Sequence, residues 1–144
     1  MKIRALLLSL ACALAVSPLA RADETELGGK MEKMSGAFRA IRRQITDKSK
    51  NADSLAKLAV VKQNAEASLK YDPAKKSEIP AANQAKFVAD YQAGMKKFIA
   101  LCDKLEAALK ADNNAEAEKI CSAMGDSQKA GHKEFKKDDK KKKS

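Results

Sequence analysis

Apolar residues recur at steps of three and four along four long stretches of this chain, and that spacing is typical of one face of an α-helix. No stretch alternates apolar and polar residues as a half-buried strand would, and the helix formers Ala, Lys, Leu, Glu and Gln are abundant. Pro73 and Pro80 bracket the one clear interruption. The pattern predicts helices at about residues 27–46, 52–69, 80–110 and 114–137.

Each predicted helix carries a stripe of side chains, mostly apolar, that a shared core can bury. The stripes are Met31, Met34, Phe38, Ile41 and Ile45; Leu55, Leu58, Ala59, Lys62, Ala65 and Leu69; Phe87, Tyr91, Met95, Phe98, Cys102, Leu105 and Leu109; and Ala117, Ile120, Cys121, Met124, Gln128, His132 and Phe135. Lys62 weakens the second stripe because it is charged. Short connections between amphipathic helices favour an all-α fold, an up-down-up-down antiparallel four-helix bundle.

The first residues have the composition of an export signal. Lys2 and Arg4 form a basic start, residues 5–16 are apolar, and small residues around Ala22 suit cleavage before Asp23. The apolar run is shorter than the ~20 residues that a membrane-spanning helix needs. The sequence therefore predicts a cleaved signal peptide and a protein that is not integral to the membrane.

This prediction divides the chain into a signal peptide at residues 1–22, a bundle at 23–137 and a basic tail at 138–144. We expect the mature protein to be periplasmic. A lipoprotein signal at Cys12 is a weaker alternative, because the preceding Ser9-Leu10 fits the lipoprotein motif poorly.

Positive charge dominates the chain, and its formal net charge is +10 at pH 7. Loss of residues 1–22 removes three cations and no acid, which lowers the charge to +7. The lysine-rich tail reads as a disordered, solvated end, and the alternative is a docking patch for an acidic protein or an anionic surface. Nucleic acid is disfavoured as a partner by the export signal and by the lack of aromatic residues among the lysines.

Cys102 and Cys121 remain after the signal peptide is removed, and they lie equally far from the predicted turn between the third and fourth helices. We expect them at the same height on antiparallel neighbours, where a disulfide forms if their Cα atoms come within ~7 Å. Two buried free thiols are the alternative. A catalytic thiol pair is disfavoured, because the two residues lack Cys-x-x-Cys spacing.

His132 is the only histidine, and it lies near the end of the fourth predicted helix. In an antiparallel bundle, the start of the first helix and the end of the fourth lie together, so we expect Met31 and His132 to face one another. A thioether and an imidazole can fill both axial positions of haem iron, which favours electron transfer. The haem would be non-covalent, since the chain lacks Cys-x-x-Cys-His. The alternative is a surface histidine near a helix end and a methionine that only fills the core.

Both ends of the predicted bundle resemble the cytochrome b562 family. The segment Leu27–Met34 resembles the family's opening, which carries a methionine ligand, and Gly131–Lys136 resembles its closing segment with the histidine ligand. Helix order and length are similar over nearly all of the mature chain. The resemblance implies a periplasmic four-helix bundle that binds one haem b, with Met31 and His132 as the axial ligands of the iron.

The resemblance also implies which side chains surround the haem. They are Met34, Phe38, Tyr91, Met95, Met124 and Phe135. The family has basic residues one turn either side of the histidine that reach the haem propionates; Lys136 keeps one, whereas Gln128 is neutral. Gly131 stands where the family has an aromatic residue. These departures affect the expected haem affinity more than the expected fold.

We therefore expect an electron-transfer protein rather than an enzyme, a monomer whose exposed haem edge meets an acidic redox partner near Lys129, Lys133 and Lys136. The alternative is a haem-free periplasmic helical bundle with a binding or stress-related role. A divalent-metal buffer has little support, because no Glu-x-x-His pair lies on any stripe.

Overall fold

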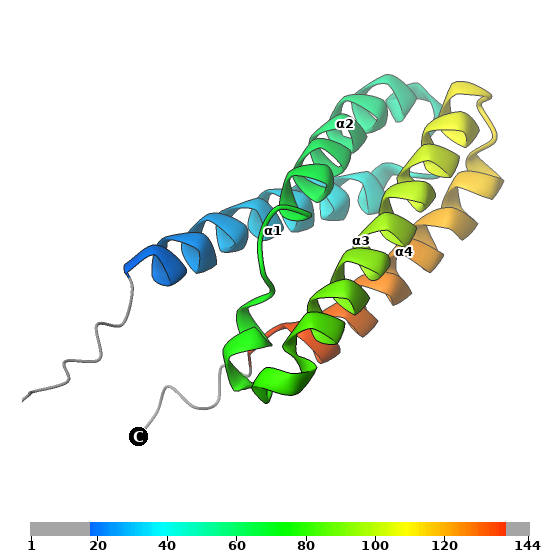
Figure 1. Cartoon of the computed structure of the whole chain (residues 1–144). Helices are drawn as coiled ribbons and strands as arrows, with labels where there is room; N and C mark the ends of the chain where they lie inside the picture. Colours follow the sequence, from blue (N-terminus) through cyan, green and yellow to red (C-terminus); the bar gives the residue numbers. More distant parts are fainter. Residues whose placement is uncertain (1–17, 138–144) are drawn as a thin grey trace, which may run out of the picture.

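The computed structural model describes the backbone of residues 18–137 and the side chains of residues 26–137. This part of the chain folds into four α-helices and two short 3₁₀ segments, without a strand (Figure 1). The elements are α1 (Pro18–Gln44), η1 (Lys48–Lys50), α2 (Asn51–Ser68), η2 (Ala74–Glu78), α3 (Ala81–Lys110) and α4 (Asn114–Phe135).

The predicted helices are confirmed, and most of their boundaries agree within two residues. The exception is α1, which begins at Pro18 instead of about Leu27. Pro is well suited to the first turn of a helix because its φ is already helical. Residues 1–17 of the predicted signal peptide and the predicted tail at 138–144 lie outside the described residues, so both stay predictions.

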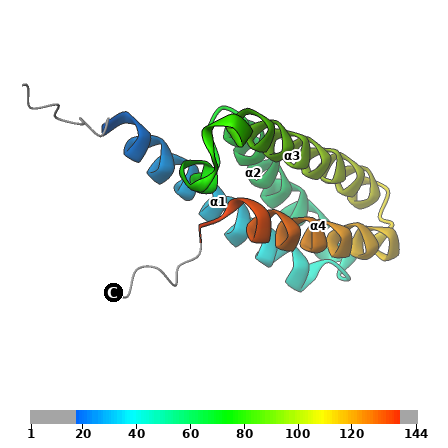
Figure 2. The ribbon, with the colours of Figure 1, turned by 60° about the horizontal axis from the view of Figure 1, so that its bottom comes forward.

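A buried pair of asparagines joins the α1–α2 turn to the α3–α4 turn. The Asn114 Nδ2 donates to the Ile45 carbonyl (2.6 Å) and to Asn51 Oδ1 (2.9 Å). The Asn51 Nδ2 donates in return to Asn114 Oδ1 (3.1 Å) and to the Leu109 carbonyl (3.3 Å). Both turns therefore lie at one end of the molecule, with α1 and α3 running toward it and α2 and α4 running away (Figures 1 and 2).

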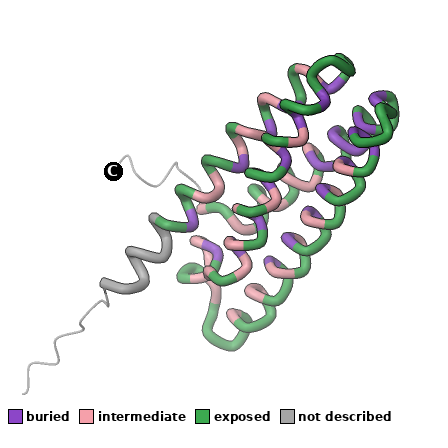
Figure 3. Tube along the Cα trace, turned by 90° about the horizontal axis from the view of Figure 1, so that it is seen from above, coloured by how far each residue is buried: buried purple, intermediate pink, exposed green. Residues whose placement is uncertain are grey.

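The core lies along the inner faces of the four helices (Figure 3). The predicted stripes of α1 and α3 are buried except at their first residues, Met31 and Phe87, which are half-buried. Phe38 and Phe98 meet edge to face at the centre, with ring centroids 6.4 Å apart. Burial of these large side chains is the main stabilising term of the fold, at roughly 1.5–3 kcal/mol for each.

The buried face of α2 differs from the predicted stripe. Ser54, Val61 and Ser68 are fully buried, whereas Ala59 is exposed and Lys62 lies at the edge. The serines can be buried because their hydroxyls are bonded: Ser54 Oγ accepts from Gln44 (2.9 Å), and Ser68 Oγ donates to the Asn64 carbonyl (2.7 Å). A buried polar group with a partner avoids most of its desolvation penalty.

The helices do not pack equally against one another. Close backbone contacts join α1 to α2, α2 to α3 and α3 to α4, while α1 and α4 approach closely at very few points. Figure 1 shows α1 diverging from the α3–α4 hairpin toward its N-terminal half. The α1/α4 boundary is therefore a seam that is narrow toward the turns and wider toward the other end.

Candidate functional site

The seam between α1 and α4 is identified by a contact between Arg42 and Gly125. The Arg42 Nη1 lies 3.8 Å from the position that a Cβ on Gly125 would occupy. Arg42 thus marks the side of α1 that faces α4, and Gly125 marks the side of α4 that faces α1. Residues that recur at helical spacing from these two positions lie along the same seam.

Met31 and His132 both recur at such positions. Met31 precedes Arg42 by eleven residues, about three turns, and His132 follows Gly125 by seven residues, about two turns. Since α1 and α4 are antiparallel, both steps lead toward the wider end of the seam. The Cα atoms are then about 16 Å and about 10 Å from the Arg42–Gly125 contact along the axes, a difference of about one turn.

The exposure of these two side chains differs. Met31 is half-buried and packs against the core. His132 is exposed, and although its carbonyl accepts from the Lys136 N–H at 3.2 Å, its imidazole makes no hydrogen bond to a described residue. The prediction that His132 lies on the buried stripe is wrong, because the stripe of α4 continues from Met124 through Gln128, Gly131 and Phe135. His132 directly follows Gly131, so its imidazole lies beside this stripe, on the side of α4 that faces α1.

The side chains predicted to line the site are largely brought together in the core. Met34, Phe38, Tyr91, Met95 and Met124 are buried, and Phe135 is half-buried against them. These residues come from α1, α3 and α4, and their surfaces are aromatic or thioether. Such a lining suits a flat apolar ring system and offers no charge to a small polar substrate.

Phe135 forms an aromatic group with two residues at the start of α3. Its ring centroid lies 5.2 Å from that of Phe87 and 5.5 Å from that of Tyr91. Phe87 was not predicted as a lining residue, although its place one turn before Tyr91 on the same stripe is a signal for this role. The three rings fix the end of α4, and with it His132, against α3.

Tyr91 is anchored at this position by a hydrogen bond, in which its hydroxyl donates to the Ser68 carbonyl at 3.2 Å. Burial raises the pKa of Tyr91 from 10 to about 12, so the phenol keeps its proton further into the alkaline range. The Tyr91 hydroxyl therefore binds α2, while the Tyr91 ring contacts Phe135.

Cys102 and Cys121 are both free and buried, which is the second alternative stated for them. Burial raises the pKa of Cys102 to about 12 and that of Cys121 to about 11. A thiol with such a pKa is protonated at neutral pH and is a poor nucleophile or metal ligand. Among the described residues, no three His, Cys, Asp or Glu side chains gather as a metal-binding group.

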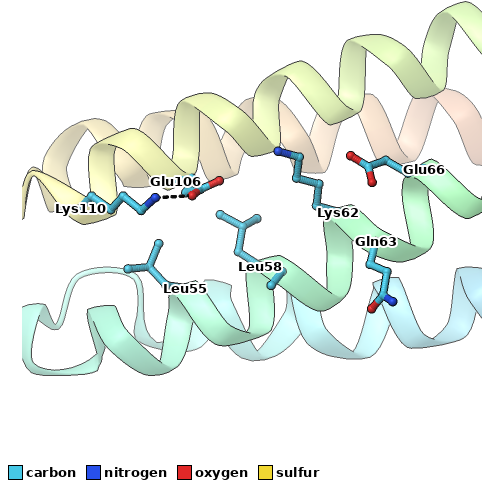
Figure 4. A pocket seen from close by; sticks show the side chains of 8 residues that line it. Leu55, Leu58, Lys62, Gln63, Glu66, Glu106 and Lys110 are labelled. Atoms are coloured by element: carbon cyan, nitrogen blue, oxygen red, sulfur yellow. Dashed lines mark hydrogen bonds and ion pairs between the residues drawn. The ribbon is translucent and has the colours of Figure 1, made fainter.

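A separate groove of about 380 Å³ lies between α2 and α3 (Figure 4). Its floor is Leu55, Leu58 and Ala59, and its rim carries charged side chains that include Lys62 and Glu106. The Lys62 Nζ lies 2.5 Å from the Asp103 carboxylate of α3, and this pairing raises the pKa of Lys62. The groove shares no residue with the seam, and Lys110 and Glu106 on its rim form an ion pair with one another.

No described helix combines the length and apolar content required to cross a bilayer.

A family model described as Cytochrome b562 matches residues 26–136, which span both Met31 and His132. Neither a curated protein nor a solved structure matches the chain with significance.

Proposed function

The chain belongs to the cytochrome b562 family, and from this premise we propose that Met31 and His132 ligate the iron of one non-covalent haem b. Membership of the family indicates a haem-binding electron carrier. The observation that supports these two ligands is their common place on the α1/α4 seam, on opposite helices and toward the same end.

The donor set fits haem iron. The Met31 sulfur is a soft ligand, the His132 imidazole has no competing partner among the described residues, and the two come from facing helices. Met34, Phe38 and Met124 provide the apolar surface against which a macrocycle would pack. Bound haem supplies reversible one-electron chemistry, and two protein ligands leave its iron no open position for oxygen.

Exposure of the site supports electron transfer to another protein. His132 lies at the surface, and Lys129 and Lys133 next to it on α4 are exposed and form no ion pair with a described residue. A positive rim of this kind attracts an acidic partner and raises the rate of encounter. We propose that the partner is an acidic redox protein of the periplasm, the compartment that the predicted signal peptide specifies.

The test is a titration of apo-protein with haemin, followed by absorbance spectroscopy of the oxidised and reduced forms. We expect one equivalent to bind and to give a sharp Soret band with resolved visible bands on reduction. Met31→Ala and His132→Gly should each remove the six-coordinate spectrum, and added imidazole should restore it in His132→Gly.

Met34→Ala is the matched control, because Met34 lies one turn from Met31 on the same helix and is buried in the core. This variant should keep the six-coordinate spectrum even if it binds haem less tightly. A spectrum indifferent to both Met31 and His132 would refute the ligand assignment. Failure of the wild-type chain to bind haemin would favour the haem-free binding module instead.

A further inference from the structure

Arg42 is a cation on the seam that the structure gives no acidic partner. Its guanidinium lies against Gly125 of α4, and its Cζ lies 5.9 Å from the centroid of the Phe38 ring of its own helix. Among the described residues, no carboxylate forms an ion pair with it. The contact with Phe38 is a cation–π interaction, which leaves the edge of the guanidinium and its N–H groups available.

On α4 toward the site, the nearest carboxylate in sequence to Gly125 is the exposed Asp126, and it forms no ion pair with Arg42. Gln128, one turn beyond Gly125 toward His132, is half-buried and carries no charge. The charge of Arg42 acts on buried Cys121, where it lowers the thiol pKa against the larger, opposite effect of burial. Arg42 is thus a basic side chain of α1 that contacts α4 at the seam between the two helices.

An anionic ligand in this seam needs such a cation. Haem b carries two propionate carboxylates at one edge of an otherwise apolar ring, and an Arg can bind a carboxylate with two parallel N–H···O bonds. Side chains of a helix lean toward its N-terminus, so the guanidinium of Arg42 reaches from its backbone toward the end that holds Met31. We propose that Arg42 binds a propionate of the haem and so sets the orientation of the ring between α1 and α4.

This inference rests on the proposed haem site and adds one positioning residue to it. Arg42 touches neither Met31 nor His132 in the described contacts, and its role is separable from ligation of the iron. The planar guanidinium is already held over Phe38, so little side-chain freedom is lost when the carboxylate binds. Removing it should weaken binding of the anionic ring without changing the axial ligands.

The experiment is a cycle of two proteins and two ligands, with equilibrium binding to apo-protein as its readout. Wild type and Arg42→Gln are each titrated with haemin and with its dimethyl ester, in which both carboxylates are blocked. We expect Arg42→Gln to weaken binding of haemin about fivefold, as for a partly exposed charge pair. The same substitution should leave binding of the ester unchanged, and Arg42→Lys should restore part of the affinity for haemin.

Arg43→Gln is the matched control, because it removes the same charge from the next residue, which is exposed like Arg42 but lies one step round the helix from the side that faces Gly125. It should bind haemin as the wild type does. Equal weakening by both substitutions, or equal effects on haemin and its ester, would overturn the assignment to Arg42. In that case the wild type would still bind haemin with a six-coordinate spectrum, whereas failure of the proposed function would abolish that binding altogether.

Discussion

Buried ionisable side chains in this bundle are held in their neutral forms by desolvation. Burial is the largest cause of the raised pKa values of Tyr91, Cys102 and Cys121. In each case the folded protein holds the proton more tightly than the unfolded chain does. Linkage then makes the free energy of unfolding depend on pH in the alkaline range.

The sign of this dependence gives a prediction. These groups contribute their full stabilisation below pH 9, the ordinary thiol pKa, and lose it as the pH rises toward the folded values of about 11 and 12. We expect the free energy of unfolding of reduced apo-protein to fall between pH 9 and 12. Denaturant unfolding of Cys102→Ala should show a shallower fall, and an unchanged slope would mean that Cys102 does not titrate as a buried thiol.

At the scale of elements, the Asn51–Asn114 pair joins the two turns by hydrogen bonds, in addition to the apolar packing of Ile45 and Leu109 in the core. The Asn114 amide donates to the Ile45 carbonyl after the end of α1, and the Asn51 amide donates to the Leu109 carbonyl at the end of α3, which also accepts from the Asp112 N–H. A buried polar pair has directional bonds, so it fixes the relative position of the two hairpins more sharply than packing does. The opposite end of the molecule, with Met31 and His132, is aligned from this anchor.

Asn114→Ala removes two donated bonds and leaves buried acceptors on Ile45 and Asn51 without a partner. We expect a loss of about 2–3 kcal/mol in the free energy of unfolding, measured by urea denaturation. The neighbouring Asn113 is the control, since its side chain only caps α4 by accepting from the Glu116 N–H at 3.2 Å. Asn113→Ala should cost about 1 kcal/mol, and an equal effect of both substitutions would contradict the role given to Asn114.

For the whole molecule, α1 and α4 pack weakly against one another, so we expect the stability of the bundle to depend on a ligand that contacts both helices. The helix α1 packs mainly against α2 and has few close contacts with α4, and its N-terminal half diverges from α4 (Figure 1). A group ligated by Met31 on one side and His132 on the other would close this boundary. Ligand binding to the folded state alone adds to its stability by mass action.

We therefore expect haem to stabilise the protein against heat. At a free concentration of 100 times the dissociation constant, the gain is about 2.7 kcal/mol, which thermal unfolding followed by circular dichroism can measure. His132→Ala should lose most of this gain while its apo form melts like the wild-type apo-protein, because the His132 imidazole is exposed and makes no hydrogen bond to a described residue. Equal stabilisation of both proteins would show that haem binds elsewhere.

Periodicity alone determined the helices of this protein and the buried faces of α1, α3 and the first half of α4. Their stripes are dominated by large apolar residues, which have only one favourable side, so no tertiary partner was needed to identify it. The same reasoning placed Met31, Met34 and Met124 on stripes that share one core, whereas the resemblance to the family implied their role around a haem.

Tertiary contacts decided what depends on a partner. The buried face of α2 includes Ser54 and Ser68. These two serines can be buried because their hydroxyls form hydrogen bonds. His132 lies at the edge of its stripe because Gly131 takes the inward position. Arg42 lies on the α1/α4 seam because Gly125 of α4 packs against its guanidinium. The apolar side chains that must be buried can be recognised from the sequence. Whether a polar side chain can be buried depends on the hydrogen-bond partners that the folded structure places beside it.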